Sequence, residues 1–233
     1  MVKDELIKRS PLRVLEQAIH GGLGKGYIGV LASPKGVGKT ACLVHIATDK
    51  LLQGRSVIHV SYSSRVDYII NWYEDIYTEL AKKRKLESAV DIHDEIVKNR
   101  VIMNFNQEGT RTEQVLRSLE AMIDFGKFPA EAIIVDGYDF TKSAVEDLAK
   151  FKVFAGKLGL EVWFSASLKE NGVPMYGEGG MPGLLQDAAA AIDVLITLHA
   201  VGDHVELRVV KDKDHPAPGL LKLKLDPKTL LIM

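Results

Sequence analysis

The chain has 233 residues, of which 46% are hydrophobic and 26% charged, and its net charge is −1 at pH 7. These values are ordinary for one large folded domain, which we expect to span residues 1–233. They exclude the global basic field that non-specific nucleic-acid binding needs, although a local basic patch stays open. No apolar run approaches the roughly 20 residues of a membrane span, and charges occupy the start where a secretory signal needs apolar residues. We therefore expect a cytoplasmic protein that does not contact a membrane.

Apolar spacing predicts a series of helices and strands that alternate along the chain. The expected helices cover residues 5–19, 40–53, 67–85, 86–100, 111–123 and 143–158. Capping boxes are predicted at Thr110-x-x-Glu113 and Ser143-x-x-Glu146. The expected strands are 27–32, 56–62, 101–105, 132–136, 160–165 and 191–198, followed by a strand pair at 205–210 and 220–225. Residues 1–22 are read as an N-terminal helix and linker, and residues 64–100 as a helical excursion.

This alternation predicts the α/β class, with a mostly parallel sheet covered by helices on both faces. Helical patterns stop after residue 200, so antiparallel strands are expected at the C-terminal end. The glycine-rich segment 172–183 is expected to form a loop beside the functional site. The single Cys42 cannot form an internal disulfide and is interpreted as a packing residue.

A candidate phosphate-binding loop lies between the first expected strand and the helix that follows it. Ser33-Pro34-Lys35-Gly36-Val37-Gly38-Lys39-Thr40 matches the pattern G-x-x-x-x-G-K-[ST] except that Ser33 replaces the first glycine. Glycines allow backbone N–H groups to point at a phosphate, and the following helix adds its positive end. Lys39 would neutralise β- and γ-phosphate oxygens. The alternative is a chance match in a surface loop. The expected nucleotide contacts are Ser33, Lys35, Gly36, Val37, Gly38, Lys39, Thr40 and Ala41.

A metal role is predicted for two residues of this candidate site. Asp136 follows four apolar residues and ends an expected buried strand, where a P-loop fold uses an aspartate to hold Mg²⁺. The Thr40 hydroxyl would ligate the same ion. The alternative for Asp136 is a helix cap or turn residue. The expected ligands are therefore ATP or ADP with Mg²⁺.

Taken together, residues 12–232 resemble the RecA-fold P-loop ATPases, in particular their KaiC and replicative-helicase branch. The resemblance is carried by Gly21-Gly22-Leu23-x-x-Gly26, the phosphate loop, Asp136, Ser165-Ala166-Ser167 and the tail 207–215. It implies that Ser165 is a polar sensor and that segment 172–183 points into a central channel, where relatives contact DNA or a protein partner. It also implies a homo-oligomer, ring or filament, in which a Lys-x-Arg pair of one subunit reaches the γ-phosphate of the next.

Lys211-x-Lys213 stands at the position of that pair, which keeps the charge but loses the planar fork of arginine. Two lysines at i and i+2 on a strand are expected to face the same side, so both could address one anion. The alternative is a solvated strand edge that blocks edge pairing.

The family's activating glutamate is missing from its usual place after the second expected strand. Ser63 and Ser64 occupy that place, and Gly137 fills the other common position. A serine cannot act as a general base at neutral pH without a base of its own. Asp139 is the candidate substitute, and we expect hydrolysis to be weak or activated by a partner.

Three functions remain open from the sequence. The first is an oligomeric ATPase that couples nucleotide state to DNA or protein binding, and the second is a non-hydrolysing, nucleotide-gated scaffold. The third is an ATPase of the MinD and ParA class, although Pro34 stands where that class has its signature lysine. Histidine and cysteine spacing does not predict a zinc site.

Overall fold

The computed structural model describes residues 7–63, 65, 67–84, 89–106, 108–142, 145–169 and 175–233. The helices are α2 (Leu12–Ala18), α3 (Lys39–Leu52), α4 (Asp67–Arg84), α5 (Ala89–Lys98), α6 (Thr112–Asp124) and α7 (Val145–Leu158). The strands are β1 (Ile28–Pro34), β2 (Ser56–Ser61), β3 (Arg100–Asn104), β4 (Ala130–Asp136), β5 (Glu161–Leu168), β6 (Val194–Val201), β7 (His204–Asp212) and β8 (Gly219–Leu225). Short 3₁₀ turns lie at Glu178–Gly180, Gly183–Leu185 and Ala189–Ala191.

All eight strands belong to one sheet in the order β3-β2-β4-β5-β1-β6-β7-β8. The first six in this order are parallel, whereas β7 and β8 pair antiparallel at the C-terminal edge. The structure confirms the predicted α/β class, the mostly parallel sheet and the C-terminal antiparallel strands. Parallel strands have to be joined by long crossover connections, which is why helices alternate with them along the chain.

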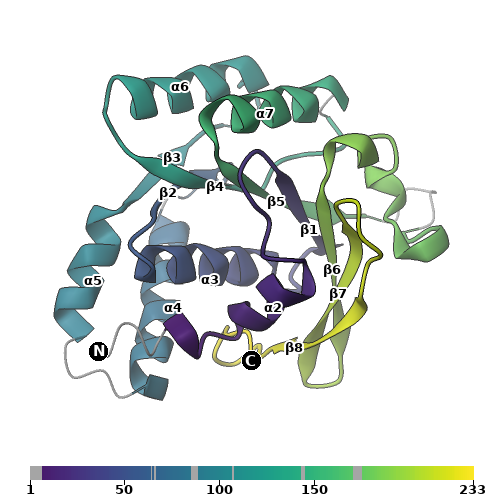
Figure 1. Cartoon of the computed structure of the whole chain (residues 1–233), viewed down its shortest axis with the longest axis horizontal. Helices are drawn as coiled ribbons and strands as arrows, with labels where there is room; N and C mark the ends of the chain where they lie inside the picture. Colours follow the sequence, from purple (N-terminus) through teal and green to yellow (C-terminus); the bar gives the residue numbers. More distant parts are fainter. Residues whose placement is uncertain are drawn as a thin grey trace.

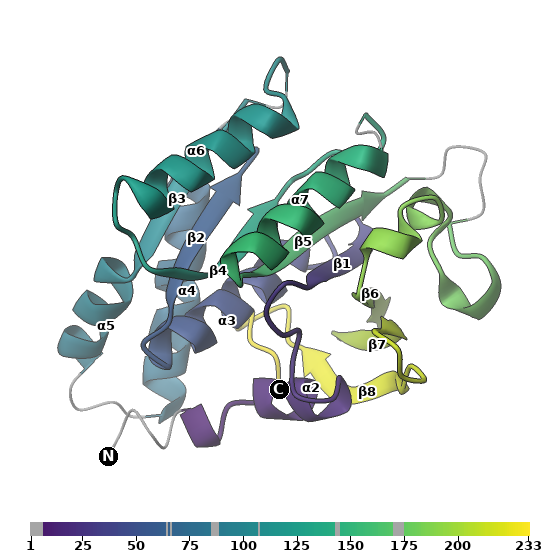
Figure 2. The ribbon, with the colours of Figure 1, turned by 45° about the horizontal axis from the view of Figure 1, so that its top comes forward.

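Helices cover both faces of the sheet (Figure 1). α6 and α7 lie side by side on one face (Figure 2), where Lys157 of α7 pairs with Glu120 of α6 at 2.7 Å. α3, α4 and α5 lie on the other face, and α2 packs near β8. Each face encloses its own cluster of buried hydrophobic side chains. Burial on both faces explains why the central strands read as continuous apolar runs.

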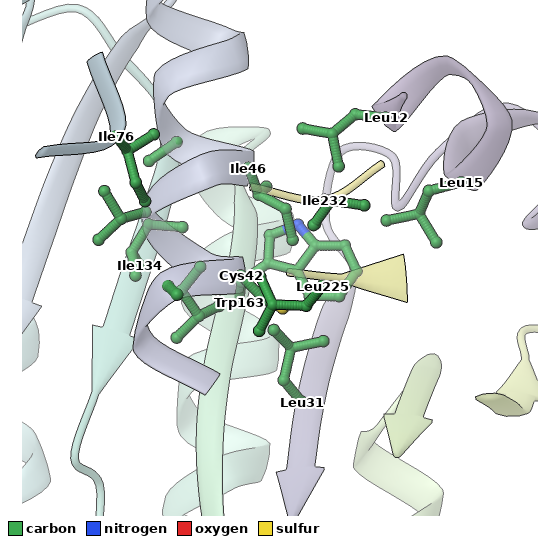
Figure 3. Close-up of a cluster of buried hydrophobic side chains, with 14 of the residues drawn as sticks. Leu12, Leu15, Leu31, Cys42, Ile46, Ile76, Ile134, Trp163, Leu225 and Ile232 are labelled. Atoms are coloured by element: carbon green, nitrogen blue, oxygen red, sulfur yellow. The ribbon is translucent and has the colours of Figure 1, made fainter. Parts of the chain in front are cut away.

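The cluster beneath α3 joins residues from both ends of the chain. Figure 3 shows Leu15 of α2, Cys42 and Ile46 of α3, Trp163 of β5 and Ile232 near the C-terminus gathered in it. Cys42 has no exposed surface, and burial raises the pKa of its thiol to about 12. A thiol that stays protonated at neutral pH is poorly reactive, so the packing role of Cys42 is confirmed.

Helix starts differ in detail from the sequence-based expectation. The predicted box at Thr110 and Glu113 is wrong by one residue, because the Gln114 side chain accepts a hydrogen bond from Arg111 N at 2.8 Å. Glu113 instead pairs with Lys150 of α7. The expected cap Ser143 lies outside the described residues, as do residues 1–6, Ser64, residues 85–88 and the first part of segment 172–183, residues 172–174.

The carboxyl ends of the parallel strands lie at one edge of the sheet. Pro34 of β1 is in register with Leu168 of β5, and Ser61 of β2 with Asp136 of β4. Ligands of open α/β sheets bind outside this edge. No helix among the residues that the structure describes is long and apolar enough to cross a membrane.

Candidate functional site

The predicted phosphate-binding loop connects the end of β1 with the start of α3. Gly38 is the N-cap of α3 with φ +114°, and Gly36 has φ +85°. L-residues with a side chain rarely adopt such angles, which explains the glycines. A Cβ on Gly38 would also approach Leu225 Cδ2 to 2.3 Å, whereas one on Gly36 would meet open space. The loop therefore depends on Gly38 for both conformation and packing.

Ser33 replaces the first glycine of the pattern without strain, because it still belongs to β1. It pairs in register with Ser167 of β5, and its hydroxyl donates to Pro34 O at 3.1 Å. The chain turns only after Pro34. At Ser33 the backbone is that of a strand, in which any side chain is tolerated.

Lys39 is folded back over the loop. Its Nζ donates to Pro34 O at 2.8 Å and to Ser33 O at 3.0 Å, and the residue is 7% exposed. Burial lowers the pKa of Lys39 to about 8, against the opposing effect of the Asp136 carboxylate. Lys39 Nζ also donates to the Ser33 hydroxyl at 3.3 Å, so all of its printed partners are neutral oxygens. A partly buried cation held by neutral groups is poised to pair with an anion.

Thr40 and Asp136 come together as predicted, although 96 residues separate them in the sequence. The Thr40 hydroxyl donates to Oδ2 of Asp136, the last residue of β4, at 2.9 Å. In the described part of the chain, no three His, Cys, Asp or Glu side chains form a metal site. One hydroxyl and one carboxylate instead fit Mg²⁺, which keeps several waters and shares phosphate oxygens with few protein ligands.

Ser165 lies on β5, the strand between the loop-bearing β1 and the Asp136-bearing β4. It is 3% exposed, and its hydroxyl accepts a hydrogen bond from Gly137 N at 2.8 Å. Gly137 has φ +82° directly after Asp136. Ser165 thus fixes the turn that orients the Asp136 carboxylate. It sits three residues before the end of β5 rather than at the strand end that the sequence predicted.

The Asp139 carboxylate accepts hydrogen bonds from Thr141, two residues further along the chain. Its Oδ1 accepts from Thr141 N at 3.0 Å and from the Thr141 hydroxyl at 2.6 Å. Burial raises the pKa of Asp139, but these hydrogen bonds and the charges of Lys142 and Lys169 outweigh it, so the pKa is lowered. A carboxylate with a lowered pKa is a weak general base. Asp139 lines a polar pocket of about 360 Å³ beside Tyr62 and Lys142.

Ser63 lies two residues after the end of β2. Its hydroxyl accepts a hydrogen bond from Arg65 N at 3.2 Å, and its own N–H donates to Ser61 Oγ at 3.1 Å. Ser63 therefore stabilises the turn after β2, and neither contact gives it a base.

Lys211 and Lys213 lie at the amino ends of the parallel strands, whereas the candidate loop lies at their carboxyl ends. Asp212 pairs with Val194, which begins β6. Lys211 Nζ donates to Ala189 O at 2.6 Å and to Ile192 O at 2.5 Å.

Lys213 lies beyond β7 with φ +47°, and its Nζ donates to Gly22 O at 2.7 Å and to Ile19 O at 2.9 Å. The expectation that both lysines share one strand face is therefore wrong, because the chain turns after Asp212. In the single chain the two ammonium groups stabilise different loops.

No protein-family model matches this chain, and no curated protein matches it either. The site is therefore interpreted from its own geometry.

Sequence reasoning missed three contacts around the candidate site. The carbonyl of Pro34 holds Lys39, and Leu225 of β8 closes the space beside Gly38. The Thr141 hydroxyl donates a hydrogen bond to the Asp139 carboxylate. The contact between Leu225 and Gly38 depends on how β8 meets the loop, so no local pattern could have indicated it. The other two contacts are local, and the Asp-x-Thr spacing of Asp139 and Thr141 is a turn pattern that could have indicated the second.

Proposed function

We propose that this chain is a RecA-like protein that binds ATP or ADP with Mg²⁺ and couples the nucleotide state to self-association or to a DNA or protein partner. One observation carries the proposal: the Asp136 carboxylate acts electrostatically on the buried Lys39 ammonium over the loop and accepts a hydrogen bond from the Thr40 hydroxyl at 2.9 Å. Phosphate oxygens would replace the Ser33 and Pro34 carbonyls as acceptors for Lys39. Thr40 and Asp136 would hold the Mg²⁺, which would neutralise charge on the phosphates.

The role of each residue follows from its position. Backbone N–H groups from Gly36 to Ala41 would bind the phosphates, with the N-terminus of α3 adding its partial positive charge. Ser165 would keep the Asp136 turn in place as the metal binds.

The test is calorimetric titration with ADP and with a non-hydrolysable ATP analogue in the presence of Mg²⁺. The Lys39→Ala variant should lose at least about tenfold in affinity, since it removes a charge-assisted contact. Lys222→Ala is the matched control, because Lys222 is exposed on β8, on the strand face opposite to the buried Leu225 that packs beside the loop. Wild-type affinity in Lys39→Ala would overturn the proposal.

Slow turnover is the second part of the proposal. The described contacts of Ser63 provide no base, and Asp139 has a lowered pKa. Loss of a positioned base costs typically about 10²- to 10⁴-fold in rate. A non-hydrolysing, nucleotide-gated scaffold is therefore the second candidate function. Phosphate release from ATP separates the slow ATPase from the scaffold, since only the ATPase releases phosphate. A robust rate that Asp139→Asn leaves unchanged would contradict both the slow-turnover expectation and the role of Asp139.

A further inference from the structure

The last residues of the sequence fold back on β8, and residues 219–233 are called the C-terminal hairpin below. The backbones of Lys224 and Met233 exchange two hydrogen bonds of 2.9 and 2.8 Å. The Asp226 carboxylate stabilises the turn, because it accepts a hydrogen bond from the Thr229 hydroxyl at 2.8 Å. The hairpin is thus held together by its own backbone and side-chain contacts.

One buried hydrogen bond anchors the C-terminal hairpin to the middle of α3. Ile232 N donates to Nδ1 of His45 at 3.0 Å, and the two residues are 2% and 1% exposed. An imidazole nitrogen accepts a hydrogen bond only when it carries no proton. Burial and the charge of Lys83 lower the pKa of His45 to about 4, so the ring is neutral at pH 7 and remains an acceptor.

A second contact joins the C-terminal hairpin to the phosphate-binding loop itself. Leu225 lies so close to Gly38 that a Cβ on this glycine would come within 2.3 Å of Leu225 Cδ2. Val37, the preceding loop residue, packs against the same buried cluster as Leu225 and Ile232. Figure 3 shows Leu225 and Ile232 in this cluster next to α3. The hairpin therefore contacts α3 at its N-cap and again about two turns further along.

We propose that Leu225 and His45 are positioning residues for the phosphate-binding loop. Through them the docked hairpin holds Gly38 at φ +114° and fixes the first turn of α3, whose N–H groups would face the phosphates. Docking of the hairpin and binding of a nucleotide favour the same loop arrangement, so each strengthens the other. Displacement of residues 231–233 from α3 therefore weakens nucleotide binding. The coupling to nucleotide rests on the proposed function, whereas the positioning of the loop does not.

Amide hydrogen exchange measured by NMR without nucleotide tests the positioning. Cys42 N donates to Gly38 O at 3.0 Å, so its exchange reports whether the first turn of α3 is held in place. Leu225→Ala should speed this exchange at least about tenfold more than Leu223→Ala does. Leu223 is the matched control, because it is equally buried on the same face of β8 but has no atom within 4 Å of a Cβ on Gly38. Equal exchange of the Cys42 amide in the two variants would overturn the inference.

A second pair of variants tests the anchor on α3. Leucine and asparagine have nearly the same shape, but only the asparagine side chain has an oxygen that can replace Nδ1 as the acceptor. His45→Leu should speed the exchange of the Ile232 and Cys42 amides, and His45→Asn should restore both to nearly the wild-type rate. Faster exchange at Ile232 with an unchanged rate at Cys42 would overturn the inference even if Leu225→Ala does not fold.

Nucleotide binding supplies the last test. ADP with Mg²⁺ should slow the exchange of the Ile232 amide in the wild type, and ADP affinity measured by calorimetry should be at least about tenfold lower in Leu225→Ala than in Leu223→Ala. Equal ADP affinities in the two variants would contradict the coupling. If the wild type binds no ADP, the proposed nucleotide function fails, and the exchange of the Cys42 amide still decides whether the hairpin positions the loop.

Discussion

The side chain of Lys39 shows how one residue can be prepared for a ligand by its burial. The ammonium is held by the carbonyls of Ser33 and Pro34 at 3.0 and 2.8 Å, and burial lowers its pKa to about 8. A polyphosphate favours the charged form and would raise the pKa again. Binding above pH 8 therefore requires the uptake of a proton.

We expect the affinity for ADP with Mg²⁺ to fall by up to about tenfold per pH unit above pH 8, because one proton is taken up on binding. Calorimetry in buffers of different ionisation enthalpy should detect that proton. Lys39→Arg is the matched control, since its guanidinium stays charged and its affinity should not change between pH 7 and 9.5. A wild-type affinity that is constant over this range would contradict the assignment of Lys39 to the phosphates.

The two loop glycines differ in what surrounds them. Gly36→Ala adds a side chain at φ +85° in open space, and we expect it to cost about 1–2 kcal/mol of unfolding free energy. Gly38→Ala adds the contact with Leu225 Cδ2 at 2.3 Å, so its cost should be larger by about 1–3 kcal/mol. Chemical denaturation measures both. In a Leu225→Ala background the excess cost of Gly38→Ala should disappear, and an unchanged excess would show that Leu225 is not its cause.

At the scale of elements, α2 is joined to the rest of the molecule by polar contacts at both ends. Arg13 pairs with Asp49 of α3, and His20 Nδ1 lies 2.6 Å from Asp212 Oδ2 at the end of β7. Lys213 adds hydrogen bonds to the carbonyls of Ile19 and Gly22 just after the helix. The two Lys213 hydrogen bonds satisfy backbone carbonyls that a helix end leaves open.

Lys213→Met keeps the aliphatic length but removes both hydrogen bonds, and should cost about 1–3 kcal/mol of unfolding free energy. Amide hydrogen exchange should also increase locally at residues 19–23. Lys222→Met, on the exposed face of β8, should change stability by less than about 0.5 kcal/mol. If Lys213→Met behaved like Lys222→Met, the lysine would not hold the segment after α2.

At the scale of the whole molecule, the candidate nucleotide loop lies at the carboxyl ends of the parallel strands. The Lys211–Lys213 turn lies at their amino ends, on the other side of the sheet's length. A lysine of this turn cannot serve the loop of its own chain, so any contact with phosphate requires a second subunit. In that case Lys211 or Lys213 has to exchange its backbone carbonyls for the phosphate.

We expect the mass measured by light scattering to correspond to one chain without nucleotide and to a multiple of it with ATP and Mg²⁺. Thr40→Ala, which removes a metal ligand, should abolish the increase in mass. A single-chain mass under all conditions and at high concentration would contradict self-association and leave both lysines with a structural role only.

The sequence by itself determined the class of fold and the core of the candidate site. Strand and helix periodicity follows from burial on two faces, and the loop motif is local, so Gly36, Gly38, Lys39 and Thr40 could be recognised directly. Asp136 could be added because a carboxylate that ends an apolar strand is also a local feature. Its contact with Thr40 then required only that the strands be parallel.

Only the tertiary structure decided the contacts that depend on distant segments. Leu225 beside Gly38 and the turn that separates Lys211 from Lys213 come from register and turn geometry in the C-terminal strands. The ion pair of Arg13 with Asp49 depends on how α2 packs across α3. Spacing along a chain encodes the face of a helix or strand, whereas the partner of that face is set by packing across the whole molecule.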